Sequence, residues 1–243
     1  MAHHHLLSGC RWLLLGTLAL AAGAHALDVS PLRVQIPATA VQAELWLHNP
    51  EDRPWSGQAR LYRWEQTEHS DVLVPAQDVA VSPAELRIDA SADQRLRVVR
   101  LGPAPSGHEH GYRLVLQAGP DSPALRISLP VFLAPAATDT DGPALTAQLQ
   151  GDAGSSASLL LYNAGARHTR LADLVFVDAA GQRHTLFPGL AGYVLAHRQR
   201  RWALPGPAQA YTGGQFRARQ DGDAETLLGP EPGQIAPAPG AGL

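Results

Sequence analysis

The sequence predicts an all-β protein built from two β-sandwich domains. Short apolar runs, alternating or rich in β-branched residues, recur along its 243 residues, and turn-forming residues separate them, including 20 Pro and 23 Gly. After residue 26 we find no long run with the apolar period of 3.6 residues that marks an amphipathic helix. Many short strands with frequent turn signals are typical of β-sandwiches.

Residues 1–26 have the pattern of a secretory signal peptide. Arg11 supplies a positive charge, an apolar stretch runs from Trp12 to Ala22, and Ala24-His25-Ala26 fits the small-x-small cleavage pattern. This stretch is short for a bilayer span, and no other segment has the character of one, so we expect no stable membrane insertion. Since Cys10 is the only cysteine, the exported chain would have no disulfide and no cysteine nucleophile.

Residues 27–136 form the first predicted domain. The turn signals Asn49-Pro50, Pro54 and Ser106-Gly107 separate its β-patterned runs. The predicted strands are 28–36, 41–48, 57–65, 71–74, 84–88, 94–101, 111–117 and 124–133.

Residues 137–142 lie in a small, polar, Pro-bounded stretch, which predicts a linker. The second predicted domain covers residues 143–218, with strands at 144–150, 157–163, 170–178, 182–187, 193–203 and 209–217. From 219 to 243 the chain is mostly Gly, Pro, Ala and acidic residues, with few large apolar side chains after Leu228. Such a segment buries too little surface to offset its chain entropy, so we expect a disordered tail.

The last predicted strand of the first domain has an apolar row on one face. Leu125, Ile127, Leu129 and Val131 share this face because strand side chains alternate with period two. Pro130 cannot donate to a sheet ladder, so the strand is predicted to lie at an edge. An apolar edge strand can pair with another polypeptide, although the same alternation also fits a half-buried interior strand.

The composition excludes several function classes. The formal net charge of −3 gives no reason to expect nucleic-acid binding. His108 and His110 would share a strand face, but no third ligand is identifiable, so we predict no metal site and no cofactor. Acidic residues are scattered, and no serine stands in a nucleophile-elbow context. We therefore do not predict an enzyme.

A series of short motifs gives the chain a family resemblance. In order, they are Val29-Ser30-Pro31-Leu32-Arg33-Val34, Leu45-Trp46-Leu47-His48-Asn49, Arg60-Leu61-Tyr62-Arg63-Trp64, Val81-Ser82-Pro83, 94–100, 109–114, 129–135, Leu161-Tyr162-Asn163-Ala164-Gly165 and Gly192-Tyr193-Val194-Leu195. Their order and spacing resemble those of PapD-like periplasmic chaperones of the chaperone–usher pilus pathway. The Pro-Val-Phe pattern is more similar to the archaic branch.

The resemblance implies two immunoglobulin-like sandwiches in an L-shaped arrangement and a periplasmic location. It also implies donor-strand complementation, in which the chaperone lends a strand to an incomplete pilus or fimbrial subunit and later delivers it to an outer-membrane usher. Leu125, Ile127, Leu129 and Val131 would then be the donated row.

The resemblance assigns further roles to single residues. Arg33 matches an arginine that anchors the carboxylate at the subunit's C-terminus, a task suited to a guanidinium fork. A second anchor, a lysine in better-known members, is replaced by Pro130, and Arg126 or another base could substitute. Arg100 and Glu109 match a buried structural ion pair.

Two other interpretations stay open at this point. The chain could be a polymerised fimbrial protein, although such subunits are usually single sandwiches. It could also be a secreted carbohydrate-binding or carbohydrate-active protein that uses aromatic residues such as Trp55 or Tyr62. The basic run at 197–201 fits either a solvated strand end or a contact surface for usher or subunit.

Overall fold

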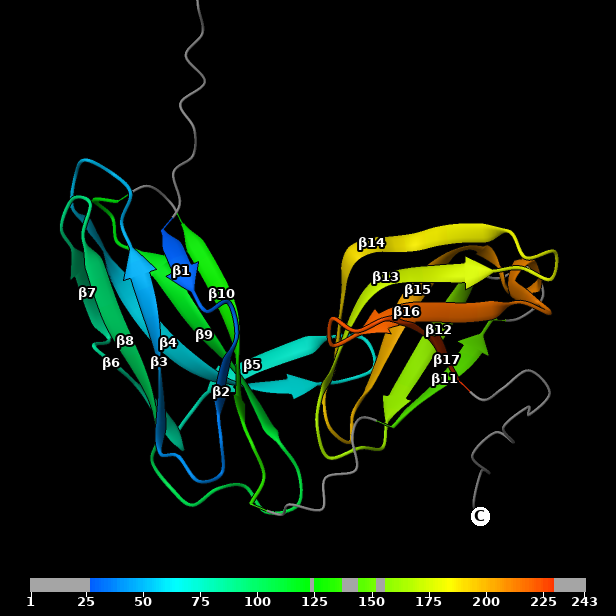
Figure 1. Ribbon diagram of the computed structural model, residues 1–243, viewed down its shortest axis with the longest axis horizontal. Coiled ribbons are helices and arrows are strands. Elements are labelled where there is room, and N and C mark those ends of the chain that lie inside the picture. Colours follow the sequence, from blue (N-terminus) through cyan, green and yellow to red (C-terminus); the bar gives the residue numbers. More distant parts are fainter. Residues whose placement is uncertain (1–26, 123–124, 137–143, 152–155, 230–243) are drawn as a thin grey trace, which may run out of the picture.

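The computed structural model describes residues 27–122, 125–136, 144–151 and 156–229. These ranges contain β-strands and one short 3-10 helix, and no α-helix. The predicted all-β class with two sandwiches is confirmed, and Figure 1 shows the two lobes with the strands of one running across those of the other. The predicted signal peptide (1–26) and linker (137–142) lie outside the described residues.

The first domain consists of two facing sheets. One has the strand order β1-β3-β8-β6, and the other has the order β2-β10-β9-β4-β5 with β7 also paired to β4. The strands are β1 (Asp28–Ser30), β2 (Val34–Ile36), β3 (Gln42–His48), β4 (Trp55–Gln66), β5 (Asp71–Pro75), β6 (Val79–Ser82), β7 (Glu85–Ile88), β8 (Asp93–Arg100), β9 (His110–Ala118) and β10 (Arg126–Leu133).

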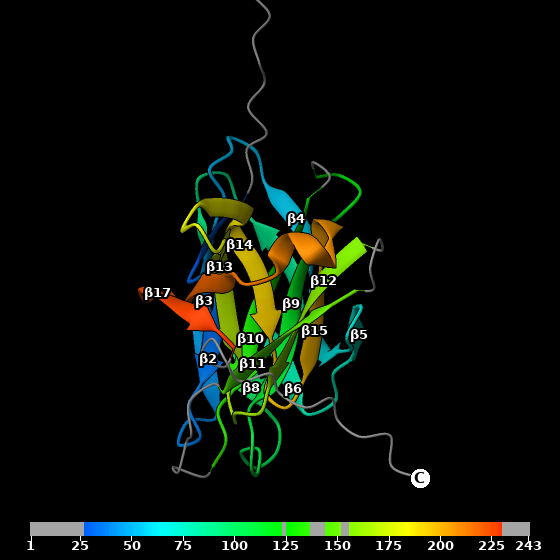
Figure 2. The same ribbon diagram turned by 90° about the vertical axis from the view of Figure 1, so that its right-hand side faces the viewer.

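The second domain also has two sheets, with strand orders β11-β12-β15 and β14-β13-β16-β17. The 3-10 helix η1 (Ala208–Tyr211) lies at the end of this domain that is remote from the first (Figures 1 and 2). The strands are β11 (Leu145–Gln150), β12 (Ser156–Asn163), β13 (Thr169–Val177), β14 (Arg183–Val194), β15 (Gln199–Pro207), β16 (Gln215–Gln220) and β17 (Glu225–Leu228).

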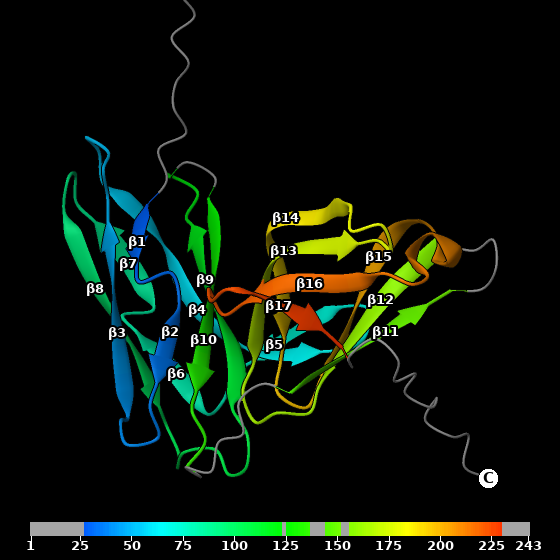
Figure 3. The same ribbon diagram turned by 45° about the vertical axis from the view of Figure 1, so that its right-hand side comes forward.

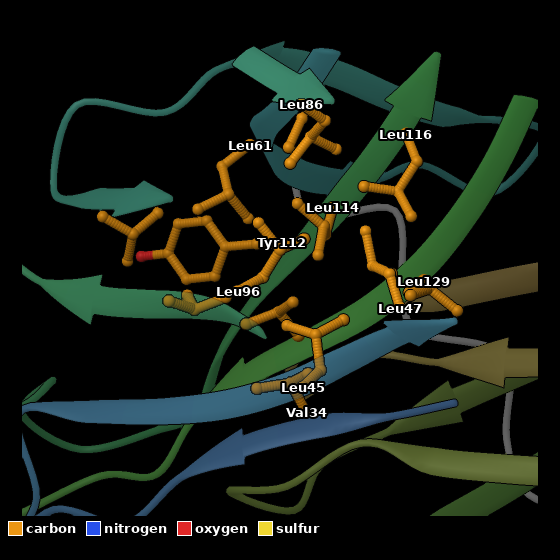
Figure 4. Packing of buried hydrophobic residues seen from close by; sticks show 14 of the residues in the cluster. Val34, Leu45, Leu47, Leu61, Leu86, Leu96, Tyr112, Leu114, Leu116 and Leu129 are labelled. Carbon is orange, nitrogen blue, oxygen red and sulfur yellow. The ribbon is translucent and has the colours of Figure 1, made fainter. Parts of the chain in front are cut away.

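Period-two patterning places the core of the first domain between its sheets. On β3, Leu45 and Leu47 are fully buried while Glu44 on the opposite face is exposed. Leu114 and Leu116 of β9 meet them from the other sheet, as Figure 4 shows. Each fully buried side chain of this size contributes roughly 1.5–3 kcal/mol to folding.

Two predicted strand assignments need correction. The predicted strand 28–36 is two strands, β1 and β2, which belong to different sheets. Pro31 has no backbone N–H to continue a ladder, so the chain crosses from one sheet to the other here. In the second domain the predicted strands 182–187 and 193–203 have the wrong bounds, because β14 runs on to Val194 and β15 begins at Gln199. Gly189 and Gly192 take the positive φ values of 67° and 144° where β14 pairs irregularly with β13.

The prediction of a disordered tail from residue 219 is wrong for residues 219–229. β16 continues to Gln220, and β17 pairs with it in register from Phe216 opposite Leu228 to Arg219 opposite Glu225. Leu228 is buried in the core of the second domain. A four-residue strand with one large buried side chain thus extends this sheet beyond β16, and composition alone does not reveal it.

Candidate functional site

The β10 strand is paired on both sides only along its second half. It runs antiparallel to β9 from Arg126 to Leu133, whereas β2 pairs with it only from Val131 to Leu133. In the part of the chain that the structure describes, the segment Arg126–Pro130 therefore has a free edge. Figure 3 shows β2 beside β10. A free edge presents unpaired backbone groups that another strand can use.

The predicted donor row faces the sandwich core. Leu125 and Ile127 are partly buried and contact the core cluster, while Leu129 and Val131 belong to it, with 5% and 0% of their area exposed. Val131 also lies in the half that β2 covers. The apolar side chains of this row that stay partly exposed are therefore Ile127, within the free edge, and Leu125, just before it.

An interdomain cleft of about 560 Å³ lies at the end of this free edge. The first domain contributes Leu32, Trp64, Arg113, Ser128, Leu129 and Pro130, among others. The second domain contributes Arg170, Leu190, Tyr193, Arg200 and Trp202, among others. The free edge of β10 and this cleft are thus adjacent.

Arg113 lies in this cleft between two aromatic rings. Its guanidinium carbon is 3.6 Å from the centre of the Trp64 ring and 5.6 Å from that of Tyr193, which gives it cation–π contacts to both domains. Burial lowers the pKa of Arg113, but an arginine side chain stays protonated in a protein. Since Arg113 pairs directly with Pro130 in the sheet, it places a positive charge beside the residue that replaces the lysine of better-known members in the resemblance.

The two arginines named from the sequence occupy different places. Arg33 is exposed just before β2 and follows Leu32, a residue of the cleft wall. Arg126 is exposed beside Gln58 and Arg60 on the outer face of the sheet. It precedes Pro130 by four residues, ~13 Å along a strand, so the structure does not bring it to the cleft.

The predicted ion pair between Arg100 and Glu109 is wrong. The Arg100 guanidinium donates instead to the backbone carbonyls of Gly102, Ala38 and Ala40. Glu109 accepts a hydrogen bond from the backbone N–H of His168, and its Oε1 lies 2.5 Å from His168 Nδ1. The buried acid therefore joins the two domains instead of fixing one of them.

Other contacts of the junction surround this pair. The His168 ring stacks on Phe132 with the ring centres 3.6 Å apart. The Gln66 side chain donates to the carbonyl of Tyr193 and accepts from the N–H of Leu195. Trp64, Phe132 and Leu195 form a small hydrophobic core between the domains, against which Leu73 and Tyr193 pack.

The basic run at 197–201 is neutralised by the first domain. Arg198 pairs with Glu65 at 3.2 Å, Arg200 pairs with Asp71 at 3.4 Å, and Arg201 pairs with Glu68. All three acids lie on β4, on β5 or in the turn between them, and this hairpin reaches toward the second domain (Figures 1 and 3). The run thus clamps the domains together rather than forming a solvated strand end.

His108 and His110 of the first domain lie close to a third histidine, His197 of the second domain, at the junction. The His108 ring centre is 5.5 Å from that of His110 and 5.0 Å from that of His197 in the second domain. Even so, the described residues contain no group of three or more His, Cys, Asp or Glu side chains suited to holding a metal ion.

Sequence reasoning missed Arg113, His168 and Gln66. Arg113 alternates with buried residues on β9, which is the signal that could have placed it on the cleft face of that strand. His168 and Gln66 gain their roles only from the packing of one domain on the other. Of the two aromatic residues considered for sugar binding, Trp55 is buried and Tyr62 is half-buried.

Comparison with known proteins supports the family resemblance. Residues 26–139 match the family model described as pili and flagellar-assembly chaperone, PapD N-terminal domain. Comparison with curated proteins gives no match.

Solved structures of similar fold cover most of the chain. One is the chaperone–tip adhesion subunit complex CsuC–CsuE from archaic Csu pili of Acinetobacter baumannii, with 21% identity, a TM-score of 0.67, and coverage of 84% of this chain and 97% of that chain. Another is the chaperone CupB2 of Pseudomonas aeruginosa, with 18% identity, a TM-score of 0.56, and coverage of 82% and 97%. A third is the Escherichia coli chaperone DraB, with 18% identity, a TM-score of 0.57, and coverage of 84% and 97%.

The family model and the solved structures of similar fold all belong to one class of proteins, the pilus-assembly chaperones. The resemblance to PapD-like chaperones is thereby confirmed, since residues 26–139, which include the first domain, match the PapD N-terminal domain. Within the described residues, no helix has the length and apolar character of a membrane span.

Proposed function

We propose that this protein is a pilus-assembly chaperone that acts in the periplasm, where it captures pilus subunits by donor-strand complementation and delivers them to an outer-membrane usher. The observation that carries this proposal is the free edge of β10 from Arg126 to Pro130, next to the partly exposed Leu125 and Ile127. An incomplete subunit sandwich would pair its backbone with this edge and cover the two side chains.

The cleft would fix the register of the donated strand. Arg113 and Arg33 would hold the carboxylate at the subunit's C-terminus, Arg113 by position beside Pro130 and Arg33 from the exposed segment before β2. A guanidinium fork binds a carboxylate with two charge-assisted hydrogen bonds. Register matters here because a slip of one residue turns an apolar row to the wrong face.

The experiment is co-expression of the tagged, exported chaperone with the pilus-subunit genes that neighbour its own gene. We expect the wild-type protein to co-purify a subunit from the periplasm, and Ile127→Asp to lose it, because a carboxylate cannot enter an apolar groove without a large desolvation cost. The matched control is Gln117→Asp, an exposed position on the neighbouring strand β9.

The control should capture subunits like the wild type. Equal capture by a folded Ile127→Asp variant would exclude strand donation through this segment. Failure of the wild type to capture any neighbouring subunit would contradict the chaperone role proposed for these partners.

A further inference from the structure

The cleft has more positive charge than one terminal carboxylate requires. Its lining contains four arginines, Arg113, Arg170, Arg200 and Arg201, and a single acid, Asp71. Asp71 already accepts from Arg200 and from the Gln66 amide, and Arg201 is paired with Glu68. Within the described residues, Arg113 and Arg170 have no carboxylate within 4 Å.

These two arginines come from different domains and flank one aromatic ring. Arg170 of β13 lies directly opposite Tyr193 of β14, so the two side chains stand on the same face of their sheet. The Tyr193 ring in turn contacts the Arg113 guanidinium across the domain boundary. Arg113, Tyr193 and Arg170 therefore form a row along the cleft.

We propose that the cleft is a two-anion site that recognises an acidic C-terminal segment of a pilus subunit. Arg113 would bind the terminal carboxylate, and Arg170 would bind an acidic side chain within the last three residues. This inference rests on the proposed function, and it adds a role for the second domain in choosing the subunit.

Spacing and charge both support this occupant. An extended chain rises ~3.3 Å per residue, so an acid one or two positions before the terminus reaches past one aromatic ring. A partly buried guanidinium without a counter-charge is costly, and a carboxylate that arrives with the ligand compensates that cost. Leu32 and Leu190, with 69% and 59% of their area exposed, add an apolar rim from each domain.

The test uses one fluorescent twelve-residue peptide of alternating Val and Ser, made in four forms. The C-terminus is either a free acid or an amide, and the third residue from the end is either Glu or Gln. Fluorescence anisotropy with the full-length chaperone measures each affinity. We expect the free acid to bind at least tenfold more tightly than the amide, and Glu about tenfold more tightly than Gln, as for charge-assisted pairs.

Variants separate the two anion positions. Arg170→Gln should abolish the preference for Glu over Gln and keep the preference for acid over amide, and Arg113→Gln should do the reverse. Arg87→Gln, an exposed position on β7, is the matched control and should keep both preferences.

The outcomes distinguish the inference from the function beneath it. If Arg170→Gln retains the Glu preference, or the wild type has none, the second anion site is excluded while carboxylate anchoring stands. If the wild type binds all four forms equally or none of them, the anchoring cleft is excluded together with the inference.

Discussion

Glu109 and His168 form a buried polar contact between the two domains, with 2% and 7% of their side-chain area exposed. Each also has a second polar atom, Glu109 Oε2 and His168 Nε2, without a hydrogen-bond partner in the described part of the chain. Removing one residue would leave the other buried with even fewer partners. A small change here should therefore have a large effect on the junction.

We predict that His168→Ala destabilises the protein by roughly 3–5 kcal/mol, the usual cost of breaking a buried polar pair. The substitution removes both the hydrogen bond to Glu109 and the stacking on Phe132. Urea unfolding followed by tryptophan fluorescence measures the change, since Trp64 lies at the junction.

His184→Ala is the control for this experiment. His184 pairs with Asp178 at 2.9 Å but is 46% exposed, so its loss should cost less than about 1 kcal/mol. Equal effects of the two substitutions would show that the His168 pair does not hold the domains together.

At the scale of elements, β10 combines two tasks along one strand. Its second half is part of the sandwich core and is paired on both sides, while its first half has a free edge. The division explains how an edge can be offered to a partner without loosening the domain. It also means that residues of the same apolar row should respond differently to substitution.

We predict that Leu129→Ala destabilises the free chaperone by roughly 2–5 kcal/mol, as buried Leu truncations do. Leu125→Ala should cost clearly less, because Leu125 is only partly buried and precedes the strand. Thermal and urea denaturation of the free protein compare the two. If Leu125→Ala proved as costly as Leu129→Ala, the first half of the row would be core as well, and its exposure could not serve a partner.

The sequence predicted the elements well where local patterning decides them. Alternation and turn residues located most strands, and the predicted edge strand is an edge only from Arg126 to Pro130, because β2 covers the rest of β10. The division of 28–36 into β1 and β2 escaped prediction because β2 pairs with β10, a strand distant in the chain. β17 escaped because it lies in a stretch whose composition predicts disorder, although it pairs with the neighbouring strand β16. The cleft was harder still, since Arg113 and Arg170 become neighbours of one ring only when two domains pack together.

At the scale of the whole molecule, the position of the cleft depends on the junction between the domains. Packing around Trp64, Phe132 and Leu195 fixes the domains at the back of the cleft, and the three Arg–acid pairs hold the β4–β5 hairpin against the second domain. The histidine group at 108, 110 and 197 lies at the edge of the same junction. We expect a charge added to this group to change the angle between the domains and with it the shape of the cleft.

Protonation of this group is opposed by its surroundings. Burial lowers the pKa of His108, and the charges of His197 and Arg198 lower it further. Burial likewise lowers the pKa of His110, followed by Arg63, whose Nη1 lies 3.1 Å from His110 Nδ1. Glu65 and Asp78 act in the opposite direction but are outweighed.

We therefore predict that the junction weakens in mild acid. A histidine with a lowered pKa in the folded state binds fewer protons than in the unfolded chain, so its contribution is complete above about pH 6.5 and is lost as the pH falls through the folded value. The free energy of unfolding should fall from pH 7 to pH 5, and the fluorescence transfer between dyes on the two domains should change with it.

The double variant His108→Asn, His110→Asn should flatten both profiles, whereas His69→Asn, an exposed position in the β4–β5 turn, should not. Because Glu225, with a pKa of about 2, responds only below about pH 4.5, its ion pairs do not contribute in this window. Profiles that are identical in the wild type and the double variant would show that the histidine group does not couple pH to the domain angle.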